Sequence, residues 1–174
     1  MTDDPYASRS APPAATATLA TAPAAGWQSL HLTLHTDGAA TDAFVTGSLA
    51  PLMDGRYGPG AGDWFFIRYH EGGPHLRIRF RGAGSGGDAA RHAAALAAEL
   101  ALAAAGTTPA TGTWPGRHGE VRVVAYEPET ERYGGPAALP VAEELFVHST
   151  RAAVAALRAV PGRAERLRLA LDLA

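Results

Sequence analysis

The sequence predicts an α+β fold with a mostly antiparallel sheet and helices packed on one face. Three observations predict it. Short runs of alternating apolar and polar residues indicate strands with one buried face, two of these runs lie close enough to form a hairpin, and longer runs rich in alanine and leucine indicate helices. Along the chain the expected order is strand, helix, strand, strand, helix, strand, helix, helix, which is typical of α+β domains. The 174 residues suit one domain.

The first 25 residues differ in composition from the rest of the chain. They are rich in Ala, Pro and Thr and hold almost no large apolar side chain, so burial cannot offset the entropy of ordering them. We therefore expect residues 1–25 to form a disordered arm and residues 26–174 to form the domain. The last helical pattern still recurs at Ala174, which predicts that a C-terminal part of the domain is missing from this chain.

The domain is expected to open with a strand over residues 29–35, where three leucines alternate with polar residues. Asp37 or Thr41 then caps a predicted helix that runs to about Met53. Residues 55–62 are predicted to be a loop because they contain several glycines and a proline.

A hairpin follows, with strands at residues 64–70 and 75–81 joined by the four-residue loop 71–74. Side chains alternate across a sheet, so each strand divides its residues between two faces. The face expected to join the core carries Phe65, Ile67, Tyr69, Leu76, Ile78 and Phe80. The face expected to point away carries Arg68, His70, His75, Arg77 and Arg79.

The second half of the chain is predicted to be mainly helical. Asp88 caps an alanine- and leucine-rich helix that runs to about residue 105, and a strand follows over 120–126. Residues 127–136 are irregular. Two amphipathic helices follow, one over about 139–160 and one from about 162 onward.

The polar face of the hairpin is the most informative chemical feature. It has three arginines and two histidines, and neither strand carries an acid. Like charges opposite one another destabilise a sheet, whereas guanidinium groups match a carboxylate or phosphate with two parallel hydrogen bonds. The pattern therefore predicts an anion site. The alternative is a solvated face whose arginines meet acids from elsewhere in the fold.

A second charged segment, residues 127–135, follows the end of a predicted strand, where loops commonly hold functional groups. Arg132 in this segment could turn back toward the hairpin face, and the alternative is a charged surface turn. His31 and His35 lie on the polar face of their strand within reach of a ligand, but solvated histidines are the simpler interpretation.

Composition excludes several classes of protein. The chain has no Cys, which excludes thiolate metal sites and cysteine nucleophiles, and all 15 of its basic residues are Arg, which excludes lysine chemistry. The histidines lack metal-site spacing, so no metal is expected. A net charge of -2 gives no general attraction to nucleic acid. No membrane-length apolar run or secretory signal is present, and we expect a cytoplasmic protein.

Four blocks of sequence stand out together: WFFIRY at 64–69, GPHLRIRF at 73–80, YEPETERYGG at 126–135 and AEELF at 142–146. In this order and spacing they resemble the thiopeptide-type bacteriocin biosynthesis domain. That domain is the C-terminal, glutamate-eliminating part of class I lanthipeptide dehydratases, and it is also found as a split protein in thiopeptide pathways.

The resemblance implies a reaction and a set of site residues. In the family, a larger domain first glutamylates Ser or Thr of a precursor peptide from glutamyl-tRNA, and the elimination domain then expels glutamate to leave dehydroalanine or dehydrobutyrine. Arg77, Arg79 and Arg132 match the arginines that grip the glutamyl adduct. Arg68, His75 and Tyr133, in the same blocks, are our candidates for substrate binding. An active chain would be a lyase, and no cofactor is expected.

Two departures from the family suggest that the chain needs a partner. The family's C-terminal histidine has no counterpart here, and its Phe-x-x-Asp-Ser block has His148 in place of the acid. The expected partners are the precursor peptide and either a glutamylating dehydratase subunit or the missing C-terminal half. Two alternatives are the [4+2] cyclase branch of the family, which forms pyridine rings, and a noncatalytic subunit that binds the precursor or stabilises a partner.

Overall fold

The computed structural model describes residues 26–58, 60–82, 89–160 and 162–172. The arm predicted over residues 1–25 and the helix cap predicted at Asp88 lie outside these residues. Among the described residues, no helix has the length and apolarity needed to cross a bilayer.

The described elements follow the expected order. The strands are β1 (Gln28–Thr33), β2 (Gly62–Tyr69), β3 (His75–Gly82) and β4 (Val121–Val124). The helices are α1 (Gly38–Phe44), α2 (Ala50–Tyr57), α3 (Ala89–Ala105), α4 (Leu139–Ala159) and α5 (Arg163–Asp172). A π-helical turn, η1 (Val45–Leu49), joins α1 to α2, and a 3-10 turn, η2 (Thr130–Tyr133), lies in the segment predicted to be irregular.

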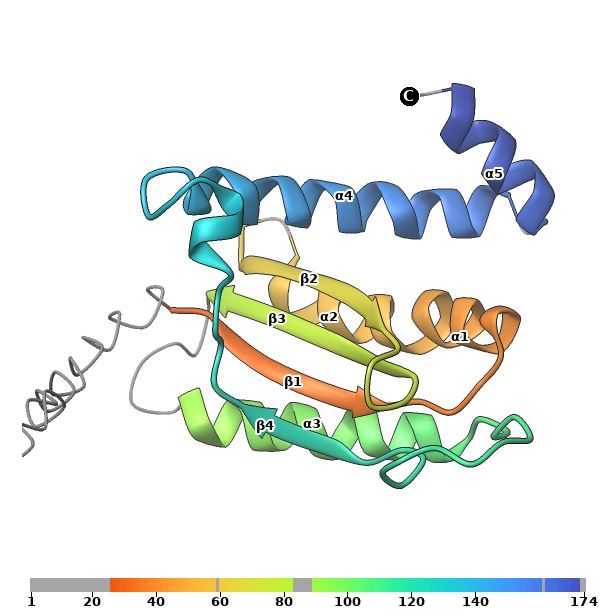
Figure 1. Cartoon of the computed structure of the whole chain (residues 1–174). Coiled ribbons are helices and arrows are strands. Elements are labelled where there is room, and N and C mark those ends of the chain that lie inside the picture. Colours follow the sequence, from red (N-terminus) through yellow and green to blue (C-terminus); the bar gives the residue numbers. More distant parts are fainter. Residues whose placement is uncertain (1–25, 59, 83–88, 161, 173–174) are drawn as a thin grey trace, which may run out of the picture.

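The four strands form one antiparallel sheet in the order β2-β3-β1-β4, which confirms the predicted fold class. In Figure 1, α1 and α2 lie behind the sheet and α4 runs beside β2. The main core fills the space between the sheet and α1, α2 and α3. Its fully buried members include Leu30, Leu32, Leu76, Ile78 and Phe80.

A smaller apolar cluster lies on the opposite face of the sheet, at the end where α4 begins. Trp27 contacts Phe65 edge to face at a centroid distance of 5.0 Å, and both side chains are buried. Val147 of α4 belongs to the same cluster, and Phe146 packs against Phe65 at 5.3 Å. This cluster covers one end of the second face and leaves the rest of that face free of helices (Figure 1).

The helical run after β1 extends further than the sequence predicts. It continues to Tyr57, which is buried against Phe80, so the first part of the loop predicted over 55–62 is helical. Pro51 does not end the run, because it takes one of the first two positions of α2, directly after the π-helical turn. Its missing N–H is tolerated at that point of a helix.

The predicted hairpin register is wrong by one residue. Tyr69, and not His70, pairs with His75, so five residues, 70–74, join the strands. The extra residue belongs to the turn because Gly73 N–H donates to the His70 carbonyl and the Pro74 carbonyl accepts from Leu34 N–H. Gly72 and Gly73 both have positive φ, which glycine adopts at little cost.

A one-residue slip exchanges the two faces of β2. Phe65, Ile67 and Tyr69, predicted for the core face, lie on the second face with the arginines of β3. Arg68, predicted beside Arg77 and Arg79, lies on the helix side, where its guanidinium forms a 2.6 Å ion pair with Asp42 of α1. The faces predicted for β3 are correct, since Leu76, Ile78 and Phe80 are buried in the main core.

Candidate anion site on the open face of the sheet

The second face of the sheet gathers cationic and aromatic side chains from all four strands. Because β1 lies between β3 and β4, Arg77, His31 and Arg122 stand side by side in one row across three strands. Arg79 occupies the neighbouring row, opposite Ser29. We call the surface formed by Tyr69, His75, Arg77, Arg79, His31 and Arg122 the arginine face.

Arg79 is the most unusual residue of this face because its charge is buried. The residue is 7% exposed, and no ion pair between described residues involves it or Arg77. Its contacts are the Tyr126 ring at 5.6 Å, His31 Nε2 at 3.5 Å and the Ile78 carbonyl at 3.4 Å. Burial, followed by the charge of Arg77, lowers the pKa of Arg79 to about 10.

A buried cation without a paired acid is costly, since desolvation is not offset by attraction to an opposite charge. The next arginine on the same strand face shows the contrast: Arg81 donates two hydrogen bonds to Asp63, at 3.1 and 3.0 Å. Ser29, the strand partner of Arg79, has a buried hydroxyl with no partner in the structure. The charge of Arg79 and the hydroxyl of Ser29 both favour an anionic ligand at this position.

Arg77 is held in place by two side chains of the arginine face. Its guanidinium lies 3.5 Å from the centroid of the Tyr69 ring, and its Nε donates to His75 Nε2 at 3.3 Å. The other ring nitrogen of His75, Nδ1, lies 2.8 Å from the Gly73 carbonyl. Stacking and one hydrogen bond therefore orient Arg77 and leave most of its N–H groups available to a ligand.

His31 lies at the centre of the arginine face. Its ring is 5.4 Å from the ring of His75. Burial lowers the pKa of His31 to about 4, with further lowering by the charges of Arg79, Arg77, His75 and Arg122. The imidazole is therefore neutral at neutral pH, even though the surface around it is strongly cationic.

A buried acid borders the arginine face but serves other partners. Glu143 of α4 accepts hydrogen bonds from Trp27 Nε1 at 2.7 Å and from the Tyr126 hydroxyl at 2.8 Å, and it lies 3.9 Å from Arg81. Burial and the hydrogen bond to Glu143 raise the pKa of Tyr126 well above its usual value. Glu143 thus fixes α4 to the sheet, and Arg77 and Arg79 form no ion pair with it.

Arg132 lies on η2, the 3-10 turn that precedes α4. Its side chain is 71% exposed and donates to Glu129 at 2.7 Å. The hydrogen bond to Glu129 and the Glu129 charge raise the pKa of Arg132, with weaker contributions from Tyr133 and Tyr69. Tyr133 packs edge to face on Phe146 at 5.1 Å, which anchors η2 to α4.

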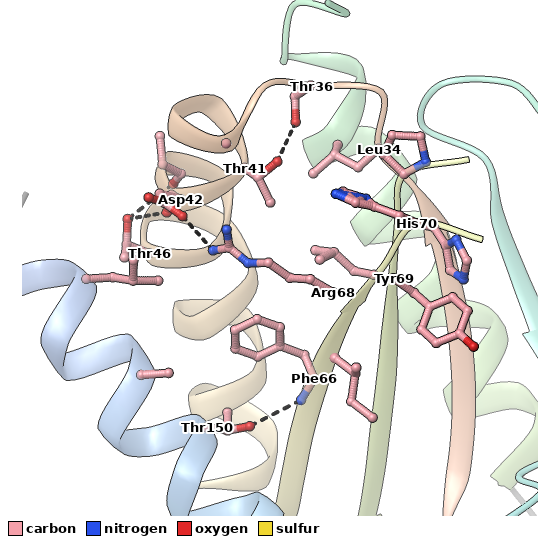
Figure 2. Close-up of a pocket in the computed structure, with 18 of the residues that line it drawn as sticks. Leu34, Thr36, Thr41, Asp42, Thr46, Phe66, Arg68, Tyr69, His70 and Thr150 are labelled. Atoms are coloured by element: carbon pink, nitrogen blue, oxygen red, sulfur yellow. Dashed lines mark hydrogen bonds and ion pairs between the residues drawn. The ribbon is translucent and has the colours of Figure 1, made fainter. Parts of the chain in front are cut away.

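A cleft of about 1780 Å³ adjoins the arginine face along the free edge of β2. It lies between β2, α1 and α4, and Figure 2 shows Arg68 reaching across it to Asp42. Arg77 and Arg79 do not line this cleft, but their neighbours Tyr69 and His75 do. The residues that line it also include Arg68, His70, Thr150 and Tyr133. Tyr69 and His75 thus connect the cleft to Arg77 on the arginine face.

The structure brings together some of the predicted site residues and separates others. Arg77, Arg79 and His75 share one face, while Arg68 lies on the other side of β2, lines the cleft and is paired with Asp42. The sequence patterns do not predict Arg122 or Glu143 as residues at or beside the site. The alternation of VRVV gives Arg122 a face, but only the placement of β4 next to β1 brings it to His31. Among the described residues, no cluster of three or more acids or histidines could hold a metal ion.

A family model and solved structures are similar to this chain. The family model described as "Lantibiotic biosynthesis dehydratase C-term" matches residues 27–174. The chain is similar to the tRNA-dependent lantibiotic dehydratase MibB from Microbispora sp. 107891, with 30% identity, a TM-score of 0.58, and coverage of 81% of this chain and 13% of that one. The chain is also similar to the crystal structure of TsrL, with 28% identity, a TM-score of 0.54, and coverage of 84% of this chain and 39% of that one. The chain thus spans well under half of either relative, and no curated protein matches it.

Proposed function

The chain belongs to the family of C-terminal domains of lantibiotic biosynthesis dehydratases, and we propose that it eliminates glutamate from a glutamylated precursor peptide. The products would be the expelled glutamate and a dehydroalanine or dehydrobutyrine residue in a ribosomally made peptide of the lantibiotic or thiopeptide type. The observation that carries the proposal is the buried charge of Arg79 beside Arg77, which has no ion-pair partner among the described residues.

The chemistry of the reaction matches this charge. In a β-elimination, a base removes the α-proton, a Cα=Cβ bond forms, and the Cβ–O bond breaks to release a carboxylate. Negative charge therefore develops on the departing carboxylate in the transition state, where fixed donors in a water-poor site stabilise it most. Arg77 and Arg79 supply such donors. An aminoacyl-tRNA is activated at its α-carboxyl group, so the glutamyl adduct also presents a free γ-carboxylate, and the two neighbouring guanidinium groups would hold the departing carboxylate and the γ-carboxylate between them.

The other candidate residues have places in this proposal. Arg132, whose exposed side chain is paired with Glu129, would leave that acid to add a third guanidinium to the adduct. The peptide chain would lie in the cleft along β2, where His75 and Tyr133 face it from the side of the arginine face and Arg68 from the helix side. The reaction is redox-neutral and needs no cofactor.

We expect Arg77→Lys to lower the rate of glutamate loss by about 10²-fold, because lysine keeps the charge but lacks the planar fork that grips a carboxylate. The assay uses a synthetic peptide with one O-glutamyl serine and follows loss of glutamate by mass spectrometry. Arg158→Lys, on the exposed last turn of α4, is the matched control and should leave the rate unchanged. Equal rates for Arg77→Lys and the unaltered chain would contradict the proposed site.

A further inference from the structure

His31 has a position in the arginine face that the proposed reaction leaves without a role. It sits at the centre of the face, between Arg77 on β3 and Arg122 on β4, and its Nε2 lies 3.5 Å from an Arg79 NH2 group. The residue is partly exposed on the side of the sheet that would receive the substrate. Any carboxylate held jointly by Arg77 and Arg79 would therefore lie next to the His31 ring.

Of the two histidines on this face, only His31 has an available ring nitrogen. Both nitrogens of His75 are engaged, Nδ1 with the Gly73 carbonyl and Nε2 with Arg77 Nε. His31 makes one polar contact between described side chains, to Arg79, at the limit of hydrogen-bond distance. A neutral imidazole carries one lone pair, and that of His31 meets only the Arg79 guanidinium at 3.5 Å, a long contact that a carboxylate bound by Arg79 would replace.

We propose that His31 accepts the proton removed from the α-carbon of the glutamylated residue, and that the carboxylate bound by Arg77 and Arg79 enables this transfer. The inference rests on the proposed function. The electrons of the Cα–H bond form the Cα=Cβ bond, the Cβ–O electrons leave with the carboxylate, and the proton goes to the imidazole. Charge is conserved, because one cation and one anion form together from neutral groups.

The electrostatics explain why the carboxylate is needed. The charged or titratable groups that face His31 are Arg79, Arg77 and His75 of β3 and Arg122 of β4, and these groups and burial hold its pKa near 4. A base this weak takes a proton poorly at neutral pH, although it is fully deprotonated and ready to do so. A carboxylate within about 4–6 Å favours the imidazolium and typically moves a pKa by about 1–3 units, here upward toward neutrality. The basicity of His31 therefore rises when the γ-carboxylate of the adduct binds, and it rises further as the leaving carboxylate develops its charge.

This coupling has a consequence that can be measured without turnover. Since a bound carboxylate raises the pKa of His31, protonation of His31 must strengthen carboxylate binding by the same factor. The affinity for a glutamyl ligand is thus expected to increase as the pH falls from about 7 to about 5, and binding in this range should take up about one proton.

The test measures binding of a stable analogue, a peptide in which an amide replaces the glutamyl ester, by calorimetry at several pH values. The unaltered chain and His92→Asn, a control on the exposed side of α3, should both take up a proton on binding. His31→Asn should bind with the same affinity at pH 7.5 and take up none. With the ester substrate, His31→Asn should lose about 10²–10⁴-fold in rate.

Each result has a defined meaning. If the unaltered chain fails to bind the analogue, the proposed function is wrong and the inference is wrong with it. If the unaltered chain binds but His31→Asn keeps the proton uptake or the full rate, the proposed function stands and only the role of His31 is overturned. His31→Gln, with thermal unfolding as a check of folding, separates loss of the imidazole from loss of the fold.

Discussion

Replacing Arg79 with methionine is expected to make the chain more stable and much less active. The buried guanidinium has no ion-pair partner among the described residues, so its desolvation is uncompensated in the free chain. An apolar residue of similar length removes this cost, and replacing buried charges in this way typically raises the free energy of unfolding by about 1–4 kcal/mol. The same substitution removes a donor to the developing carboxylate, which typically lowers a rate by about 10²–10³-fold.

The pH dependence of this stability effect follows from the pKa of Arg79. A pKa lowered to about 10 means that folding disfavours the charged form, so the full cost is present at neutral pH and fades only as the pH rises through about 10. Denaturant unfolding at pH 7 and the mass-spectrometric assay measure the two effects on the same samples. A variant that is both less stable and equally active would show that Arg79 is a structural residue.

A second large effect is expected from adding a partner to the purified chain. The arginine face is covered by helix α4 only at one end, and Arg122 at its margin is exposed, so solvent screens the charges that should bind the carboxylate. We propose that a glutamylating dehydratase subunit or a further C-terminal segment of the same family covers this face and supplies the family's C-terminal histidine as a second proton-transfer group. Such a group typically contributes about 10²–10⁴-fold to the rate.

The experiment compares single-turnover glutamate loss with and without a full-length dehydratase of this family whose own elimination arginines are replaced. The added protein cannot eliminate glutamate by itself, so any gain in rate requires the arginine face of this chain. Arg79→Met serves as the second control and should show no gain. A fast reaction by the chain alone, unchanged by the added protein, would contradict the need for a partner.

The hairpin shows what alternation of residues can and cannot predict. The faces of β3 are correct because Leu76, Ile78 and Phe80 leave only one way to bury the strand. The faces of β2 are wrong because WFFIRY is apolar on both sides and both sides are in fact covered. Trp64 packs in the main core and Phe65 in the smaller cluster. With no polar face to fix the register, the faces depend on the loop length, which is set by the hydrogen bond of Gly73 to His70 inside the loop and by that of Leu34 to Pro74.

The site illustrates a different limit. Arg77 and Arg79 could be predicted because they are neighbours on one strand. The row of Arg77, His31 and Arg122 could not, because it depends on β1 lying between β3 and β4, and nothing in the local sequence specifies that order. Glu143 reaches Trp27 across 116 positions of the chain, so its role in fixing α4 also follows only from the tertiary structure.

The most direct test of the central claim, that the arginine face binds the glutamyl group, compares two ligands that differ in one charge. One is the stable amide analogue with a glutamyl group, and the other carries glutaminyl in its place, which is nearly the same size but lacks the γ-carboxylate. The unaltered chain is expected to prefer the glutamyl ligand by about tenfold or more, since a charge-assisted hydrogen bond contributes about 1.5–3 kcal/mol. A chain with both Arg77→Ala and Arg79→Ala is expected to lose this preference. Equal affinity of the unaltered chain for the two ligands would contradict binding of the glutamyl group by the arginine face.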